Sequence, residues 1–410
     1  MLKRSHKLSL LIALYVAQGL PFGFFTLALP VVLREAGYSL TAISALSLLY
    51  LPWALKFLWA PFLDRVGSRR TWLLWLQGSS VVAALALSQM DLQGTLLMVL
   101  AAAFLFNVIA ASQDVVTDGL AVRMLDAKER GLGNGIQVGA YRFGMILGGG
   151  LLLWVFVKSN WSIMFVGMAL LLTLTMIPVL GMPSASQVSA GEKPHLSFIL
   201  SGWINRLMTR GMLTTAALIF CYRFGDQMVS SLMGPFLKDF GLTTEMIAFM
   251  KVTVGSVTSL LGAFIGGWFT FVVGRRQALL TCGIAQAGCF VLLIIAAMDI
   301  GGTALLWWIV ILEGVIGTMA TVALFTLMMD AADPEHAGTD YTLLASVVVV
   351  VGSIANVTAG VIGDQAGYAA AFSTGTVLAL AGCLILVFVL DRYPVSNRIT
   401  SVWTTHKARD

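Results

Sequence analysis

The sequence predicts an all-α membrane protein with twelve transmembrane helices, arranged as two six-helix repeats. Three observations support this fold class. Of the 410 residues, 58% are hydrophobic and only 11% are charged, and the mean hydropathy is +0.89. A soluble domain carries about 25% charged residues, so this chain has too little charge to cover a water-facing surface. Long apolar runs recur along the whole chain, and the two halves carry similar signals in the same order.

Each predicted span is a run of mostly apolar residues long enough to cross the hydrocarbon core, which takes about 20 residues. The runs are 8–33, 41–62, 71–90, 93–117, 135–157, 161–181, 211–236, 245–272, 277–298, 303–328, 341–363 and 369–391. The first run is longer than the apolar part of a signal peptide, so we expect it to be retained. We expect an N-terminal six-helix bundle over 1–181, a cytoplasmic linker over 182–210 and a C-terminal six-helix bundle over 211–410.

The positions of Lys and Arg predict the orientation, because cytoplasmic loops carry an excess of both. If both termini are cytoplasmic, most of the 25 Lys and Arg residues fall in inner loops. Only Arg34, Lys158 and Lys238 then fall in outer loops. We therefore expect both termini in the cytoplasm and a lipid bilayer as the surroundings. The net charge of +5 follows from this topology and predicts no nucleic-acid partner.

Two sequence signals recur about half a chain apart. The corresponding pairs are Arg69-Arg70 with Arg275-Arg276 and Leu29-Pro30 with Gly234-Pro235. Two parallel six-helix repeats describe the major facilitator architecture, in which the substrate binds near the bilayer midplane between the halves. An internal repeat of this size favours a transporter that works by alternating access over a channel built from a ring of short subunits.

The loop after the second run resembles the signature G-x-x-x-D-R-x-G-R-R of the major facilitators, with Ala60 in place of the first Gly. Gly67 allows a tight turn, and Asp64 can face the positive end of a neighbouring helix or pair with an Arg. In the family this motif latches the cytoplasmic gate. The residues that we expect in this gating network are Asp64, Arg65, Arg69 and Arg70.

A second copy of the motif runs from Gly267 to Arg276, but it has Phe271 where the acid would be. Only the first copy of the motif therefore has the acidic residue that the gating role requires. The alternative is that the basic residues of both copies only anchor the topology.

Charged residues inside predicted spans are costly and are therefore candidates for function. Arg223 and Asp226 lie near the middle of the seventh run, and Glu313 lies near the middle of the tenth. Burial favours the neutral form of a carboxyl group and a nearby Arg favours the charged form, so a proton and an anionic substrate could compete for this site. We expect proton coupling and substrate binding here. The alternative is a static Arg223–Asp226 pair at i,i+3 on one helix.

Polar side chains in other predicted spans are candidates for contacts to the substrate. They are Tyr15, Gln18, Asn107 and Tyr222. Each of them could instead bridge two helices, as isolated amides and phenols in membranes often do.

A second group of charges lies in the fourth and fifth runs. Asp114 and Asp118 are one helical turn apart, and Arg142 follows in the next run. If the chain turns near residue 128, positions 114 and 142 stand at the same height, so we expect an Asp114–Arg142 pair that Lys56 can join. We expect this group to serve gating or structure rather than direct contact with the substrate.

Several functional classes lack their motifs. The chain has no GxxxxGK[ST] sequence of a P-loop ATPase and no HExxH sequence, and its four Cys show no CxxC spacing. We therefore expect no enzyme activity, no metal site and no cofactor, with the proton gradient as the energy source. The fifth run also lacks the Pro of the glycine-rich antiporter motif, which favours import over efflux.

Several segments resemble the AmpG family of muropeptide permeases, a branch of the major facilitators. The segments are Gly19-Leu20-Pro21, Lys56 to Arg65, Ala111 to Asp118, Glu129-Arg130-Gly131 and Tyr141 to Gly144. The likeness is strong over roughly 11–150 and faint in the C-terminal half. It implies proton-driven import across a bacterial inner membrane by a monomer. Relatives in this branch include siderophore permeases of the RhtX/FptX type.

The length of the chain favours a siderophore over a muropeptide as the substrate. With twelve predicted spans it is shorter than AmpG, which carries additional spans, and it looks more like the siderophore branch. The aromatic residues near its start, Tyr15, Phe22, Phe24 and Phe25, would suit a substrate with aromatic rings. We therefore expect import of a siderophore or a ferric siderophore. The alternatives are an anhydro-muropeptide permease and a membrane sensor or enzyme that does not transport.

Overall fold

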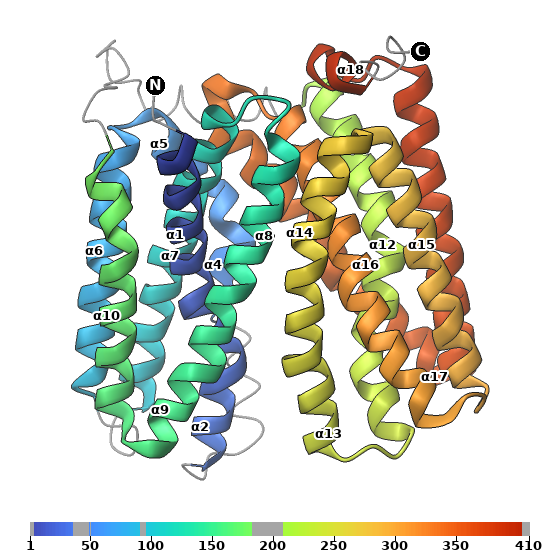
Figure 1. Ribbon diagram of the computed structural model, residues 1–410, viewed down its shortest axis with the longest axis horizontal. Helices are drawn as coiled ribbons and strands as arrows, with labels where there is room; N and C mark the ends of the chain where they lie inside the picture. The colour runs from blue at the N-terminus through green and yellow to red at the C-terminus, as the bar shows by residue number, and fades with distance from the viewer. Residues whose placement is uncertain (1–3, 36–48, 50, 91–95, 183–207, 404–410) are drawn as a thin grey trace. The chain divides into compact units, whose positions relative to one another are not determined.

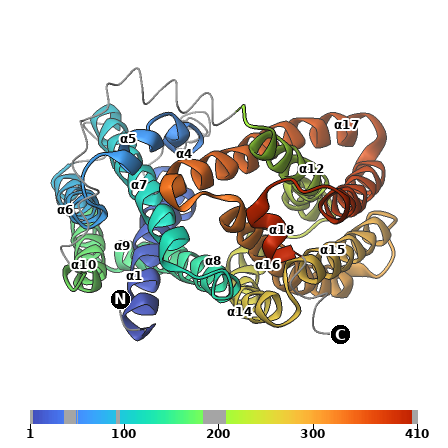
Figure 2. The same cartoon turned by 90° about the horizontal axis from the view of Figure 1, so that it is seen from above.

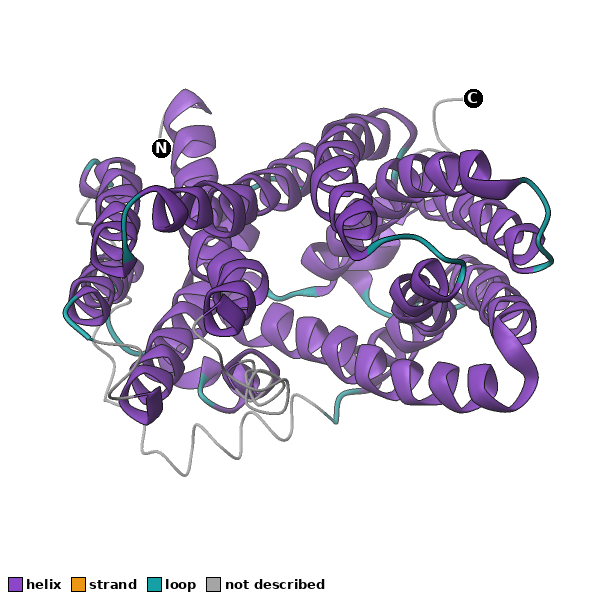
Figure 3. Ribbon diagram, turned by 90° about the horizontal axis from the view of Figure 1, so that it is seen from below, coloured by secondary structure: helices purple, strands orange, loops and turns teal. Residues whose placement is uncertain are grey.

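The computed structural model describes residues 4–35, 49, 51–90, 96–182 and 208–403. Within these ranges every regular element is a helix, as Figure 3 shows. Nine helical segments in the same ranges are long and apolar enough to cross a membrane. The predicted all-α membrane fold is therefore confirmed.

The helices of the N-terminal half follow the predicted runs (Figure 1). They are α1 (Arg4–Gly23), α2 (Leu29–Glu35), α4 (Leu51–Leu55), α5 (Ala60–Arg65), α6 (Arg69–Ser88), α7 (Leu96–Met124), α8 (Arg130–Ile146), α9 (Leu152–Lys158) and α10 (Trp161–Leu180). Single π-helical turns, η1 (Phe24–Ala28) and η4 (Leu147–Leu151), continue α1 into α2 and α8 into α9. A 3₁₀ turn, η3 (Lys56–Leu58), lies between α4 and α5. The first part of the predicted run 41–62 lies outside the described residues.

The C-terminal half contains the longest helices of the described residues. They are α12 (Arg210–Asp239), α13 (Thr244–Ala248), η5 (Phe249–Val254), α14 (Gly255–Val273), α15 (Arg275–Ala297), α16 (Gly302–Ala331), η6 (Pro334–His336), α17 (Ala337–Arg392) and α18 (Asn397–Trp403). A break at Gly367, where φ is 81°, divides α17 into two helices. The two parts of α17 correspond to the last two predicted spans.

The chain forms two compact units. Unit 1 contains residues 1–124, 140–201 and 334–342, and unit 2 contains 125–139, 202–333 and 343–410. Each unit therefore includes a short segment from the other half of the sequence, which the predicted bundles of 1–181 and 211–410 did not foresee. The predicted linker 182–210 lies almost entirely outside the described residues and stays a prediction.

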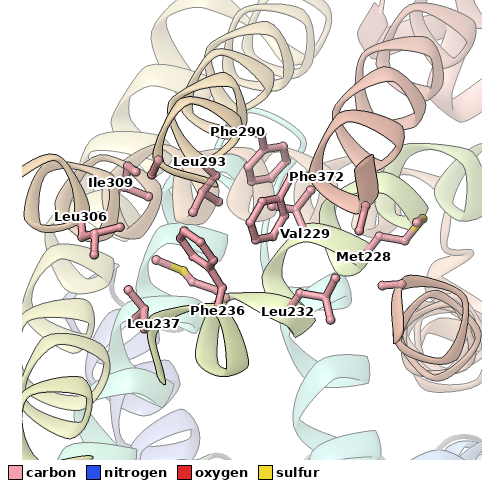
Figure 4. Close-up of a cluster of buried hydrophobic side chains, with 14 of the residues drawn as sticks. Met228, Val229, Leu232, Phe236, Leu237, Phe290, Leu293, Leu306, Ile309 and Phe372 are labelled. Atoms are coloured by element: carbon pink, nitrogen blue, oxygen red, sulfur yellow. The ribbon is translucent and has the colours of Figure 1, made fainter. Parts of the chain in front are cut away.

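The core of unit 2 is an apolar cluster between α12, α15, α16 and α17 (Figure 4). Its largest side chains include Met228, Phe236, Phe290, Ile309 and Phe372, all buried. Figure 2 shows α14, α15 and α16 side by side, as the close packing of α16 against both neighbours requires. These contacts hold the helices that carry the charged residues of unit 2.

The two copies of the loop motif have the same backbone shape at one position. Gly67 has a φ of 74° and Gly274 a φ of 82°, a left-handed conformation that favours glycine. The following helices begin at Arg69 and Arg275. The repeat that the sequence predicts is thus present in the local structure of both loops.

Candidate functional site

A buried ion pair on α12 is the centre of the polar site in unit 2. The Nη1 atom of Arg223 lies 2.5 Å from Oδ2 of Asp226, and Asp226 is only 5% exposed. The other carboxylate oxygen accepts hydrogen bonds from Gln286 Nε2 at 2.8 Å and from Ser230 Oγ at 3.4 Å. Arg223 also donates to Thr321 Oγ1 at 3.4 Å. The expected i,i+3 pair is therefore present, with further partners from α15 and α16.

Glu313 of α16 extends this polar site. A Cβ atom placed on Gly317 would lie 3.0 Å from Glu313 Oε1 and 3.1 Å from Gln286 Nε2, so both side chains converge on that glycine. The three charged residues that the sequence singles out therefore belong to one polar site, which Gln286 connects. Gln286 has no charge to mark it within its apolar run, so sequence reasoning missed it.

Tyr222 and Asn107 are buried, and each connects two helices. Tyr222 donates to the backbone carbonyl of Leu279 at 3.4 Å, and thereby links α12 to α15. Asn107 accepts from Trp53 Nε1 at 3.2 Å and donates to the Ala103 carbonyl at 2.9 Å. Both contacts agree with the alternative that isolated polar groups connect helices.

Unit 1 holds a second buried charge cluster, on α7. Lys56 of η3 forms an ion pair with Asp114, and both side chains are at least nine-tenths buried. Tyr15 of α1 donates to Asp118 Oδ1 at 3.0 Å. The structure thus places Tyr15 with the aspartates rather than with the residues of unit 2.

The expected Asp114–Arg142 pair is wrong. Asp114 pairs with Lys56, and Arg142 points its Nη1 atom at Met145 Sδ, 3.9 Å away. The reason lies in the packing of α8, whose Gly144 is so close to α1 that a Cβ there would lie 2.9 Å from the Cα of Gly19. At this level α8 therefore packs on α1, and Lys56 of η3 is the cation that reaches Asp114.

The aromatic residues near the start of the chain are mostly core. Tyr15, Phe24 and Phe25 are at most 1% exposed, and Phe24 and Phe25 pack edge to face on each other. Phe22 is half-buried and contacts Trp53 and Tyr141, with ring centroids 5.6 Å apart in each case. Three of the four rings are therefore not free to stack on a substrate.

Asp64 forms a network in unit 1 in which it both pairs with arginine and faces the positive end of a helix, the two roles that the sequence suggests for it. It pairs with Arg69, and Arg123 Nη2 lies 3.5 Å from the same oxygen. Its other oxygen accepts from the backbone N–H of Thr339 at 3.1 Å and from the Thr339 hydroxyl at 3.2 Å. Because Thr339 lies in the first turn of α17, the carboxylate caps that helix. We call this group, Asp64, Arg69, Arg123 and Thr339, the unit 1 latch.

The other two arginines of this motif are not part of the unit 1 latch. Arg70 donates to the Leu180 carbonyl at 3.2 Å, and Arg65 is half-buried.

Unit 2 has a corresponding network around Asp330, at the end of α16. The Asp330 side chain is fully buried and pairs with Arg275 Nε at 2.8 Å and with Arg130 Nη1 at 2.8 Å. Arg275 also donates to the Ala127 carbonyl. We call Asp330, Arg275, Arg130 and Ala127 the unit 2 latch. Sequence reasoning missed Asp330, although an acid that follows a long apolar run directly is a visible signal.

The described residues offer no ready metal site. Within them, no group of three or more His, Cys, Asp or Glu side chains is placed to hold a metal ion. The chemistry of both polar sites is that of ion pairs and hydrogen bonds.

Two repeats of long apolar helices, with buried ion pairs inside the helical units, define the class of polytopic membrane transporters. A family model of the Major Facilitator Superfamily matches residues 11–356 and, in a second match, 218–408. The chain belongs to the Major Facilitator Superfamily.

The relatives agree with the AmpG-like branch of this family. The chain is 28% identical over 390 residues to the anhydromuropeptide permease of Escherichia coli K12, covering 92% of this chain and 79% of that protein. It is 25% identical over 405 residues to the Rickettsia felis protein named putative transporter AmpG 4, covering 94% and 97%. The crystal structure of the major facilitator transporter FucP in its outward conformation has a TM-score of 0.72 at 14% identity, covering 94% and 99%.

Proposed function

We propose that this protein is a proton-driven importer of anionic solutes of the muropeptide class in the bacterial inner membrane. The observation that carries the proposal is the buried Arg223–Asp226 pair, with an N–O distance of 2.5 Å. Support for the substrate class comes from the E. coli relative, which is named an anhydromuropeptide permease. A muropeptide joins a sugar to a short peptide that carries carboxylates, so it can present an anion to a buried arginine.

The bonds around Asp226 make Arg223 available for exchange. One Asp226 oxygen already accepts hydrogen bonds from Gln286 and Ser230, and only the other faces Arg223. If a substrate carboxylate takes over the guanidinium, Asp226 therefore keeps two partners. Removing an ion from its partner inside a protein costs about 3–5 kcal/mol when nothing replaces that partner. An incoming carboxylate replaces it, and a solute without negative charge does not.

Siderophore import remains a prediction without structural support. Neither relative cited above is named for a siderophore. The aromatic argument for it is weaker than the sequence suggests, because Tyr15, Phe24 and Phe25 are buried in the core. We therefore place the muropeptide first, and we keep a ferric siderophore as the competing substrate in the experiment.

The remaining expectations form part of the same proposal. They are both termini in the cytoplasm, alternating access, function as a monomer, and a gating role for the two latches. The latches support this role because each joins segments that are far apart in the sequence, such as Asp64 and Thr339. Movement of such segments would have to break buried ion pairs or a helix cap.

The test is uptake into proteoliposomes of labelled anhydro-muropeptide and of a labelled ferric siderophore, with and without an inward proton gradient. We expect gradient-dependent accumulation of the muropeptide. Arg223→Gln should weaken the apparent affinity about ten- to a hundred-fold, because a hydrogen bond to a charged group contributes about 1.5–3 kcal/mol. Arg223→Lys should recover part of this loss.

The matched control is Arg276→Gln, which removes an exposed arginine that pairs with Asp391. It should leave the apparent affinity unchanged. Accumulation of the siderophore alone, or equal transport by Arg223→Gln and the wild type, would overturn the proposal.

A further inference from the structure

The cluster on α7 in unit 1 contains more negative than positive charge. Asp114 and Asp118 are 7% and 2% exposed, and Lys56 is 5% exposed. Lys56 forms its ion pair with Asp114, and Asp118 accepts from the Tyr15 hydroxyl at 3.0 Å. Two buried carboxyl groups thus lie beside one lysine. Two like charges one helical turn apart disfavour each other strongly in a low-dielectric interior.

The spacing of the two aspartates points to a proton. Asp114 and Asp118 are one turn apart on α7, so both carboxyl groups project from the same face of the helix. Two ionised carboxylates beside one lysine repel each other in a low-dielectric interior, and a proton on one of them removes that repulsion. Asp114 is compensated by Lys56, which leaves Asp118 as the group that is neutral when the proton is bound.

The surroundings of Asp118 fit a group that gains and loses charge. The ionisable groups that face it are Asp114 on its own helix, Lys56 of η3 and Tyr15 of α1, with Tyr341 of α17 acting on Tyr15. A hydroxyl such as that of Tyr15 can donate to the carboxylate or accept from the carboxylic acid, so it serves both states of Asp118.

Polar groups continue from the cluster along α1. Gln18 follows Tyr15 by one turn on the same face of the helix and is 1% exposed. Neither its amide oxygen nor its amide nitrogen has a hydrogen-bond partner within the described part of the chain. Buried amides are normally satisfied, so Gln18 offers an unused hydrogen-bonding group one turn from Tyr15.

The local backbone explains how Lys56 reaches Asp114. Residues 56–58 form the 3₁₀ turn η3 between two short α-helices, and Pro52 precedes it by one turn. A 3₁₀ stretch inside a spanning segment often marks a hinge. The Lys56 ammonium also lies 5.5 Å from the centre of the Trp53 ring, which helps to compensate its buried charge.

We propose that Asp118 binds the coupling proton, with Tyr15 as its hydrogen-bond partner and the Lys56–Asp114 pair as the fixed counter-charge. The inference rests on the proposed function, because it names the ion that drives the transporter. Substrate and proton then bind in different units, the substrate carboxylate at Arg223 and the proton at Asp118. On release, the O–H bond of Asp118 breaks, the proton leaves, and the cluster gains one negative charge that Lys56 must share.

A substrate-free measurement tests the proton site directly. The infrared difference spectrum of the purified protein between acidic and alkaline pH should contain the C=O stretching band of a protonated carboxyl group. Asp118→Asn is isosteric and should remove that band. Tyr15→Phe should shift its frequency, because the hydrogen bond to Asp118 is lost. The matched control is Asp126→Asn, which changes an exposed carboxyl group in the loop after α7. It should leave the carboxyl band unchanged.

Transport by the same variant gives the second readout. Asp118→Asn should still exchange labelled for unlabelled muropeptide, whereas its gradient-driven accumulation should fall to the level measured without a gradient. A carboxyl band that persists in Asp118→Asn, or full accumulation by this variant, would overturn the inference. If the wild type carries no muropeptide but the band belongs to Asp118, the proposed substrate is wrong and the proton site stands.

Discussion

The two latches hold equivalent arginines with carboxylates from different places. Arg69 and Arg275 are both the first residue of the helix that follows a left-handed glycine. Arg69 pairs with Asp64 of its own loop, whereas Arg275 pairs with Asp330 at the end of α16. The position that corresponds to Asp64 in the second copy is Phe271, which is 47% exposed.

This difference shows that the repeat preserves the buried arginine and not the position of the acid. A buried guanidinium requires a carboxylate, and any helix end that reaches it can supply one. In each latch one carboxylate contacts two arginines. The unit 1 latch differs because Asp64 also caps α17, and the unit 2 latch differs because its arginines are more deeply buried. The following predictions compare the two.

The largest effect is expected for Asp330→Asn. The change leaves Arg130 and Arg275 buried without a negative partner, which should lower the free energy of unfolding by about 3–5 kcal/mol. Thermal unfolding of the purified protein in detergent measures this loss. Asp333→Asn is the control, because Asp333 pairs with Arg398 at a more exposed position. Equal losses for the two variants would contradict the larger contribution to stability that we expect from the buried ion pairs of Asp330.

A smaller effect is expected for Asp64→Asn. Asparagine keeps an oxygen that can accept from the N–H of Thr339, so the helix cap survives and only the charged contacts with Arg69 and Arg123 are lost. The expected loss is about 1.5–3 kcal/mol. Asp64→Ala also removes the cap and should cost about 1 kcal/mol more. If the two variants unfold at the same temperature, the capping of α17 by Asp64 contributes nothing.

The exposed neighbour of the unit 2 latch should matter less again. Arg276 forms a two-pronged pair with Asp391, but its side chain is 40% exposed. Arg276→Gln should therefore cost only about 0.2–1 kcal/mol. Salt screens exposed pairs, so the difference between this variant and the wild type should shrink at high ionic strength. A loss that salt does not reduce would mean that the pair is effectively buried.

The smallest effect is expected for Phe271→Asp, which restores an acid to the second copy. Residue 271 is exposed and lies at the end of the predicted span 245–272, where a charge costs about 0–1 kcal/mol, so the change in stability should not exceed about 1 kcal/mol. The new acid should also fail to rescue Asp330→Asn, since residue 271 is exposed whereas the side chains of Arg130 and Arg275 are buried. Unfolding of the double variant measures this, and recovery of the lost stability would show that the two acid positions are interchangeable.

The sequence was a good guide to the elements and a poor guide to their partners. The predicted run 303–328 corresponds to α16 at Gly302–Ala331, and 161–181 to α10 at Trp161–Leu180. The Arg223–Asp226 pair was also predictable, because residues three apart on one helix are neighbours whatever surrounds them. The predicted cluster placed both Arg142 and Lys56 with Asp114, and the structure keeps Lys56 alone, since height along two helices does not tell which of their faces meet.

The sequence by itself determined the membrane fold, the internal repeat and the superfamily signature. These are local properties, because the length of a span is set by the thickness of hydrocarbon and a turn by the glycine within it. The tertiary structure alone decided that Asp330 serves Arg275, that Gln286 connects Asp226 with Glu313, and that Tyr15 serves Asp118. Such contacts depend on how helices rotate and pack, and packing is decided by many side chains from distant parts of the chain at once.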